Sequence, residues 1–345
     1  MIYRTPTYCR DFRCIAGKCK DSCCKGWEID IDAETAEYYS RVDGEFGERL
    51  RSSIKNGSFV LTEDERCPFL NMEGLCDIYT ELGEEKLCRI CSDHPRYYEW
   101  FGTVKEGGTG LCCEAAAELI LSRPFALCEE EIPFEEAAGS YDEELFSLVY
   151  NAREEMFGIL CSEDMPLSEA VCRCLDIAAD IQQSIDVPCP EAAGTADSSH
   201  ALREIFGCLY SLEPIDENWQ PYIKSRMDIL GSAQPVSRDY EPYLRRLMLY
   251  FLFRYLLKSV YDGGILGYTK FAALSIIVIG TLYRLDGCSS LKSCAETAKN
   301  YSKETEYSVE NMAELLEDFG KEPFFSTASL KALAETAFAE NMDEI

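Results

Sequence analysis

The sequence predicts a mostly α-helical protein with an irregular, cysteine-rich module at its N-terminal side. The chain has 345 residues and 19 cysteines, and residues 1–113 hold eleven of those cysteines at short spacings. From residue 114 onward, apolar residues recur at helical spacing between proline and glycine breakers. We therefore expect a cysteine-rich module over residues 1–113, with a short hairpin, packed on a multi-helix body over residues 114–345.

Within the module, Asp32 can cap a helix that runs to about Ile54 and is closed by Asn56 and Gly57. Residues 58–61 suit a short strand. Glycines between two β-prone runs favour a hairpin. Its strands are expected at 100–104 and 109–112, around a turn at 105–108.

The body is expected to consist of helices joined at prolines and glycines, with a linker at residues 187–199. Its most apolar stretch, 265–283, contains Lys270 and lies beside a second apolar stretch, 247–257, that is broken by Arg254. Two adjacent buried helices explain this pair better than a membrane span. Helices are predicted near 140–160, 167–186, 200–212, 238–261, 266–285, 290–302, 308–319 and 326–341.

The charge is strongly acidic and unevenly distributed. The chain has 62 acidic and 33 basic side chains, a net charge of −29, so it lacks the basic footprint of a nucleic-acid-binding protein. Residues 126–200 carry 18 acidic and two basic side chains, a net charge of −16. This acidic segment is either a solvated face or a surface that attracts a lysine-bearing partner.

The N-terminal residues indicate the compartment. Residues 1–12 contain no apolar run of the kind found in a secretory signal, so we expect a cytoplasmic protein. Stable disulfides are not expected there, and clustered cysteines are better interpreted as metal or redox ligands.

The cysteine spacing favours a metal centre with thiolate ligands. Thiolates select zinc, copper(I) or iron–sulfur clusters, and only two histidines are available. Zinc sites usually show two CxxC pairs, whereas Cys88 and Cys91 form the only one in the module. The adjacent Cys23 and Cys24 are awkward for one tetrahedral zinc. We therefore favour an iron–sulfur cluster, with zinc as the alternative.

Two ordered strings carry a family resemblance: CIAGKCKDSCCKGWEIDID from residue 14 and CPFLNMEGLCDIYTELGEEKLCRICSDHPR from residue 67. Together with the Cys112 segment, they resemble the flagellin lysine-N-methylase family, and in part the small zinc/iron-chelating CxxCxxxCC domains. The resemblance covers about the first 120 residues, with a weaker echo at residues 253–275.

The resemblance implies a [4Fe–4S] cluster and methyl transfer from S-adenosylmethionine to lysines of flagellin or another lysine-bearing protein. Cys113 stands where the family has proline, so we exclude it as a ligand. His94 stands where an aromatic residue is usual, and we interpret it as a local hydrogen-bonding residue. The implied metal ligands are Cys14, Cys19, Cys23, Cys24, Cys67, Cys76, Cys88, Cys91 and Cys112.

Methyl transfer requires a neutral lysine amine aligned with the methyl donor. Tyr97, Tyr98 and Trp100 are candidates for a substrate pocket, unless they only pack the module against the body. No glycine-rich turn of the dinucleotide-binding type is recognisable. The turn formed by Asp262, Gly263 and Gly264 is the candidate donor-binding segment, although a helix–helix turn needs no ligand.

Two function classes remain open at this point. The first is a lysine N-methyltransferase with an iron–sulfur module. The second is a non-catalytic iron–sulfur or zinc-binding adaptor or electron-transfer protein, which would explain the missing donor-binding fold. The size of the helical body favours the enzyme.

Overall fold

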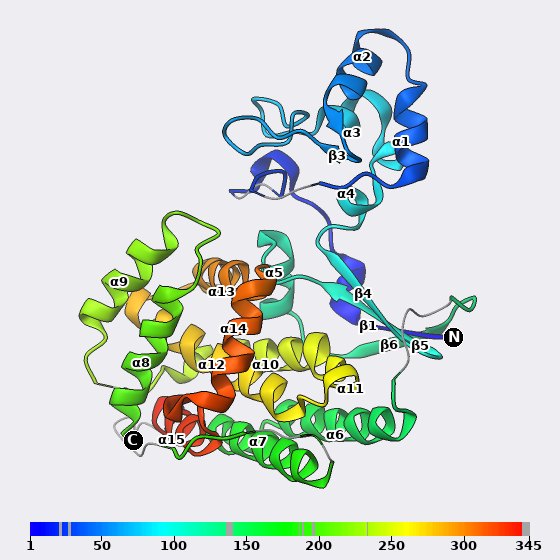
Figure 1. Ribbon diagram of the computed structural model, residues 1–345. Coiled ribbons are helices and arrows are strands. Elements are labelled where there is room, and N and C mark those ends of the chain that lie inside the picture. The colour runs from blue at the N-terminus through cyan, green and yellow to red at the C-terminus, as the bar shows by residue number, and fades with distance from the viewer. Residues whose placement is uncertain are drawn as a thin grey trace.

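The computed structural model describes residues 1–20, 23–26, 29–135, 141–185, 187, 190–194, 197–232 and 234–339. It contains two separate hydrophobic cores. A small core lies within residues 29–91, and a large core runs through the helical body and includes Tyr8 and Phe101. Figure 1 shows the corresponding arrangement: helices α1–α4 stand apart from α6–α15, and the strands connect them. We call residues 14–95 the cysteine-rich unit and residues 114–339 the helical body.

A four-stranded sheet of order β4-β5-β1-β6 connects the two parts (Figure 1). Strand β1 is central, because it pairs in parallel with β5 and antiparallel with β6. Residues 7–95 leave the sheet after β1 and return to it at β4. The strands are β1 (Ile2–Pro6), β4 (Arg96–Phe101), β5 (Val104–Thr109) and β6 (Leu127–Glu131).

The expected hairpin is present, but its predicted turn was wrong. The turn lies at residues 102–103, where Gly102 has φ +57°, and residues 105–108 lie inside β5. Gly107 and Gly108 are needed there for space, because a Cβ on either would press against the ring of Tyr98 or Tyr97 on the paired strand. The sequence pattern predicted a turn at Gly107 and Gly108, whereas these glycines lie in a strand and leave space for two tyrosine rings.

The cysteine-rich unit is built from short elements. The single helix expected from Asp32 to Ile54 is divided at residues 41–43, although Asp32 does cap its first part through the Thr35 amide. The expected strand at 58–61 is only two residues long. The elements near and within the unit are η1 (Thr7–Asp11), η2 (Ala16–Lys18), α1 (Ala33–Ser40), α2 (Gly44–Ser52), β2 (Ile54–Lys55), β3 (Ser58–Phe59), α3 (Asp77–Leu82), η3 (Glu84–Lys86) and α4 (Arg89–Asp93).

The prediction of a mostly helical protein is confirmed, and all eight predicted body helices have a counterpart. The predicted helix 238–261 is divided into four segments, and α9 was not predicted. The body elements are α5 (Glu114–Ser122), α6 (Glu143–Cys161), α7 (Leu167–Ser184), α8 (Ser198–Ser211), α9 (Trp219–Ile229), η4 (Arg238–Tyr240), α10 (Glu241–Tyr255), η5 (Leu256–Lys258), α11 (Ser259–Asp262), α12 (Ile265–Asp286), α13 (Leu291–Glu306), α14 (Val309–Lys321), η6 (Pro323–Phe325) and α15 (Thr327–Ala337).

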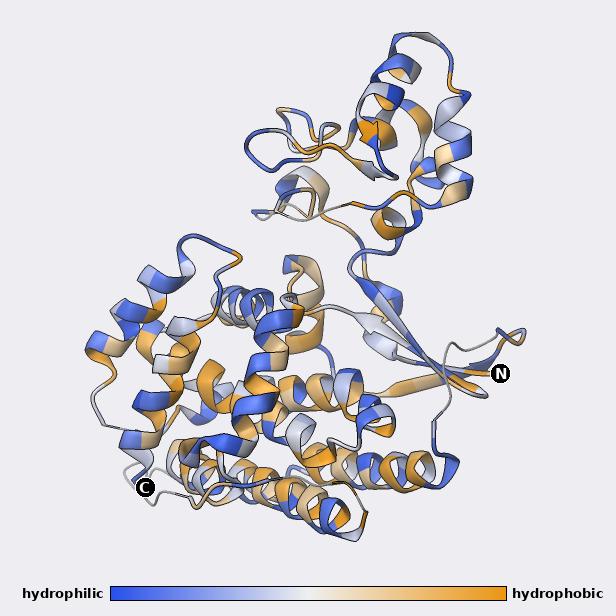
Figure 2. Cartoon of the chain, in the orientation of Figure 1, coloured by the Kyte–Doolittle hydropathy of each residue, from blue (hydrophilic) through white to orange (hydrophobic). Residues whose placement is uncertain are grey.

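Helix α12 forms the centre of the body. It is long and apolar enough to cross a membrane, and 94% of its most apolar window is buried inside the protein. Its buried residues occur around the whole helix, as expected for a core helix. Figure 2 shows apolar residues (orange) throughout the helices of the body. Lys270 within it is also buried, and its ammonium group pairs with Glu191 at 3.0 Å.

A buried ion network attaches the sheet to the body. Glu106 on β5 accepts two hydrogen bonds from Arg153 on α6, at 2.8 and 2.5 Å, and one from Arg4 on β1 at 3.3 Å. All three side chains are almost inaccessible to solvent. Arg4 also forms ion pairs with Glu129 and Glu154. The Glu106 carboxylate therefore binds one guanidinium group from the sheet and one from the helical body.

Candidate functional site

Five of the predicted metal ligands gather in the small core of the cysteine-rich unit. Cys67 and Cys88 are buried within it, and Cys24, Cys76 and Cys91 pack against it. Hydrogen bonds between backbone groups bring their loops together. The Cys67 amide donates to the Cys24 carbonyl at 2.7 Å, which joins two loops that are distant in sequence. The Cys91 amide donates to the Cys88 carbonyl at 3.0 Å within the turn that begins α4. Cys76 and Cys88 each stand directly before a short helix, α3 or α4.

The same five thiols influence one another's protonation. Burial raises the pKa of Cys67 to about 11, and the nearby Cys76 and Cys88 thiols act in the same direction. The hydrogen bond to Cys88, burial and the nearby Cys24 and Cys67 thiols raise the pKa of Cys91, while that hydrogen bond lowers the pKa of Cys88. Five soft sulfur donors in one neighbourhood suit zinc or an iron–sulfur cluster.

The other four predicted ligands lie outside that core. The Cys23 thiol is hydrogen-bonded to Cys24, whereas Cys14 is exposed and accepts the Ala16 amide at 3.3 Å. Cys19 follows η2 and is half-buried. Among the described residues, no group of three or more Cys, His, Asp or Glu side chains is arranged to hold a metal ion. The set of nine ligands therefore stays a prediction.

Cys112 faces the helical body and not the small core. Burial raises its pKa to about 12, and a hydrogen bond with the Tyr307 hydroxyl acts against this rise. The neighbouring Cys113, which we exclude as a ligand, has the Cys14 and Cys23 thiols within electrostatic range. The adjacent cysteines at 112 and 113 thus point to different parts of the molecule.

The three aromatic residues proposed for a substrate pocket do not share one side of strand β4. Tyr97 is covered by the body, and its ring lies against the Arg254 guanidinium at 4.6 Å. Tyr98 and Trp100 form a ring pair with centroids 6.3 Å apart, and Lys105 lies over both rings. This division follows from the alternation of side chains along a strand.

The candidate donor-binding turn joins α11 to α12. Both oxygens of Asp262 are already used, because Oδ1 accepts the Gly264 amide and Oδ2 accepts the Tyr268 hydroxyl, each at 2.8 Å. Gly263 has φ +73° and packs closely against Val187. The observed contacts are therefore those of a helix–helix turn, and donor binding there stays a prediction.

Sequence reasoning missed a buried polar cluster where β4, α10 and α13 meet. Glu306 Oε2 accepts the hydroxyls of Tyr250 at 2.9 Å and Tyr255 at 2.8 Å, and Arg254 Nη1 lies 3.3 Å from the same oxygen. Arg254 Nη1 also donates to the Tyr250 hydroxyl at 2.5 Å. Burial raises the pKa values of all these tyrosines and of Tyr97 well above the usual value.

One signal in the sequence points to this cluster. Arg254 interrupts an apolar stretch, and a charged residue inside a buried helix normally has a partner. The partner, Glu306, lies 52 positions further along the chain, so no local spacing connects the two.

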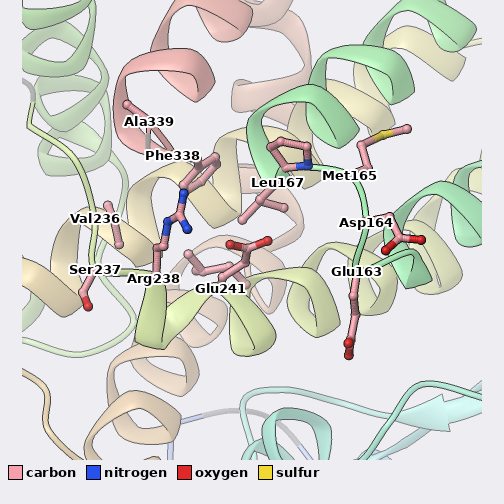
Figure 3. A pocket seen from close by; sticks show the side chains of 12 residues that line it. Glu163, Asp164, Met165, Leu167, Val236, Ser237, Arg238, Glu241, Phe338 and Ala339 are labelled. Carbon is pink, nitrogen blue, oxygen red and sulfur yellow. The ribbon is translucent and has the colours of Figure 1, made fainter. Parts of the chain in front are cut away.

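A separate cavity of about 170 Å³ lies near the first residues of α7 and α10 (Figure 3). Carboxylates of Glu163, Asp164 and Glu241 and the guanidinium of Arg238 line it. Small-molecule sites usually have roughly 300–1,000 Å³, so this cavity is small for a nucleoside-containing donor. No predicted site residue lines it.

Comparison with known proteins gives a domain match in the body. Residues 195–333 match the FliB lysine N-methylase C-terminal domain. This range contains α10, α11 and α13, and therefore Arg254, Asp262 and Glu306. No solved structure matches the chain.

Curated relatives come from Salmonella. A lysine-N-methylase of Salmonella choleraesuis strain SC-B67 is 26% identical over 146 residues, which cover 36% of this chain and 34% of that protein. The same values hold for a lysine-N-methylase of Salmonella typhimurium strain LT2. The flagellar biosynthetic protein FliU of Salmonella muenchen is 28% identical over 136 residues, which cover 35% of this chain and 78% of that protein.

The chain thus spans about a third of the length of the two lysine-N-methylases that it matches. The domain match lies in the helical body, whereas the resemblance inferred from the sequence rested mainly on the cysteine-rich strings. The resemblance to the flagellin lysine N-methylase family is therefore confirmed by a part of the chain that the cysteine motifs do not include.

Proposed function

We propose that this chain is a protein lysine N-methyltransferase that acts on flagellin, uses S-adenosylmethionine as methyl donor and holds an iron–sulfur cluster. The observation that carries the proposal is the match of residues 195–333 to the lysine N-methylase C-terminal domain. Flagellin as the substrate is supported by the flagellar name of one relative and by the cysteine strings.

The acidic segment supports a lysine-bearing substrate. Its carboxylates on β6 and in α6 and α7 are mostly exposed, for example Glu130, Glu144 and Asp176. A surface of one sign attracts a partner of the other sign and raises the rate of encounter. Binding should therefore weaken as the salt concentration rises.

The cysteine-rich unit supports a cluster or a zinc ion. Cys24, Cys67, Cys76, Cys88 and Cys91 would hold it, because their thiols already share the small core. Bound metal would tie three separate loops together in a unit whose helices are short. A [4Fe–4S] cluster is our preferred assignment, and zinc is the alternative.

A non-catalytic metal-binding adaptor is the second candidate. It is favoured by the sheet, since β1 and β5 are the only parallel pair among its four described strands, whereas most α/β enzymes hold a nucleotide on a sheet of several parallel strands. An adaptor would bind metal and a partner without transferring a methyl group.

The test is anaerobic purification followed by metal analysis, absorption spectroscopy and incubation with flagellin and S-adenosylmethionine. We expect iron with a visible absorption band, and a flagellin mass increase in steps of one methyl group. Cys88→Ser should lose the metal, and Cys161→Ser, on an exposed position of α6, should keep it. Zinc without visible absorption would refute the cluster, and unchanged flagellin mass with bound metal would favour the adaptor.

A further inference from the structure

The Arg254–Glu306 cluster contains polar groups that the protein itself leaves unsatisfied. Glu306 has a side chain with no exposed surface, and its Oε1 has no hydrogen-bond partner among the described residues. The buried hydroxyl of Tyr97 also has none. An unsatisfied buried polar group costs about 1–3 kcal/mol, so such groups call for an explanation.

Glu304, on the same helix, shows what a purely structural carboxylate looks like here. It is equally buried, and its two oxygens accept the amides of Ile215 and Asp216 at 2.7 and 2.9 Å. Both of its oxygens are satisfied by the backbone of a neighbouring loop. Glu306 differs because all of its partners gather on Oε2.

Arg254 is the complementary group. Its Nη1 bonds to Tyr250 and Glu306, while Nε and Nη2 have no hydrogen-bond partner in the described part of the chain. Its side chain keeps 12% of its surface exposed. The rings of Tyr97 and Tyr307, at 4.6 and 5.3 Å, hold the guanidinium in place. A guanidinium group that is fixed in position, with Nε and Nη2 available as donors, can bind a carboxylate through two hydrogen bonds.

We propose that Arg254 and Glu306 bind the amino-acid end of the methyl donor, whose carboxylate pairs with Arg254 and whose ammonium group pairs with Glu306 Oε1 and the Tyr97 hydroxyl. This inference rests on the proposed function, because it assigns a site to S-adenosylmethionine. A zwitterionic amino-acid group carries one anion and three donors, and the cluster offers one cation edge and two unsatisfied oxygens.

The position of the cluster suits this role. It lies beside the segment that leads from β5 to α5, since the Leu111 amide donates to the Tyr250 hydroxyl at 3.0 Å and Cys112 bonds to Tyr307. A Cβ at Gly110 would collide with the Tyr307 hydroxyl, so the backbone approaches closely there. A donor bound at this place would lie at the joint between the cysteine-rich unit and the body.

The test compares two ligands that differ only at the amino-acid end. S-adenosylhomocysteine carries that end and 5′-methylthioadenosine lacks it, and both are titrated calorimetrically into the anaerobically purified full chain. Arg254→Lys and Glu306→Gln should each weaken the binding of S-adenosylhomocysteine by about tenfold or more. The affinity for methylthioadenosine should stay unchanged. The ratio of the two affinities within each variant corrects for any unfolded fraction.

Arg245→Lys is the matched control. Arg245 is also a buried arginine of α10, but it donates to Glu241 and to the carbonyls of Leu160 at the end of α6 and of Ser162 just after it. This variant should lose stability and keep the wild-type affinity ratio. A wild-type ratio in Arg254→Lys and Glu306→Gln would overturn the inference while the proposed function stands. Failure of the wild-type chain to bind either ligand would overturn both.

Discussion

Glu106 is the residue on which the attachment of the sheet to the body depends most. Glu106→Ala would leave the guanidinium groups of Arg4 and Arg153 buried without their common partner. Breaking a buried ion pair from one side costs about 3–5 kcal/mol. We expect a loss of that size in the free energy of unfolding, measured by urea denaturation.

The control for this prediction is an exposed ion pair. Glu317 and Lys321 form an i, i+4 pair on the surface of α14, and such pairs contribute little. Glu317→Ala should leave the urea midpoint unchanged. Equal effects of the two substitutions would contradict a special role for the buried network.

His94 makes stability depend on pH. Burial and the nearby Arg254 guanidinium lower its pKa to about 4, whereas an unfolded histidine has a value near 6.5. The unfolded chain therefore binds more protons between these values, and stability is lost as the pH falls from about 6.5 to about 4. The loss should be on the order of 3 kcal/mol in unfolding free energy.

The measurement is the urea midpoint at a series of pH values, for the wild type and for His94→Gln. The substitution should remove most of the slope between about pH 6.5 and pH 4. His200→Gln is the matched control, because the side chain of His200 is 58% exposed. An identical slope in wild type and His94→Gln would show that other groups control the acid transition.

The sequence allowed us to predict which side chains lie next to each other only where the residues are close in sequence. Short spacings placed Cys88 beside Cys91 and Cys23 beside Cys24, and the structure keeps both pairs together. The pairing of Arg254 with Glu306 was not predictable, because it depends on how α10 packs near α13.

At the scale of elements, the body helices were predictable because apolar periodicity and capping agree with the tertiary packing. The first predicted helix failed at residues 41–43, because α1 ends at Ser40 and α2 begins at Gly44, where the backbone turns with φ +77°. The sheet was mostly missed. Strand β1 is stabilised by partners about 100 residues away, and no local pattern encodes such pairing.

The turn between α11 and α12 depends on a glycine, Gly263, and this dependence can be tested by substitution. Gly263→Ala should cost about 1–2 kcal/mol for the left-handed backbone, plus a further amount because the new Cβ would lie 2.7 Å from Val187. Gly231→Ala has a similar φ of +62° and open space around it. Urea denaturation should show the larger loss for Gly263→Ala, and equal losses would contradict the close packing at this turn.

At the scale of the whole molecule, the two separate cores predict that the cysteine-rich unit and the helical body differ in stability against local unfolding. Cys67→Ser replaces a buried thiol of the small core and removes a proposed ligand. Amide hydrogen exchange should then rise across α1–α4 and stay slow in α10 and α12, because regions with separate cores open separately. Cys161→Ser should change neither region. A matching increase in α12 would show that the cores unfold as one.

The central position of β1 also sets an order of events during synthesis. Its parallel partner, β5, begins about 100 residues later. At roughly 5–20 residues per second, the ribosome needs about 5–20 s to make that segment. Residues 14–95 are complete before β1 can pair with β5, so the cysteine-rich unit has time to fold on the nascent chain. The sheet then forms beside a unit that is already folded.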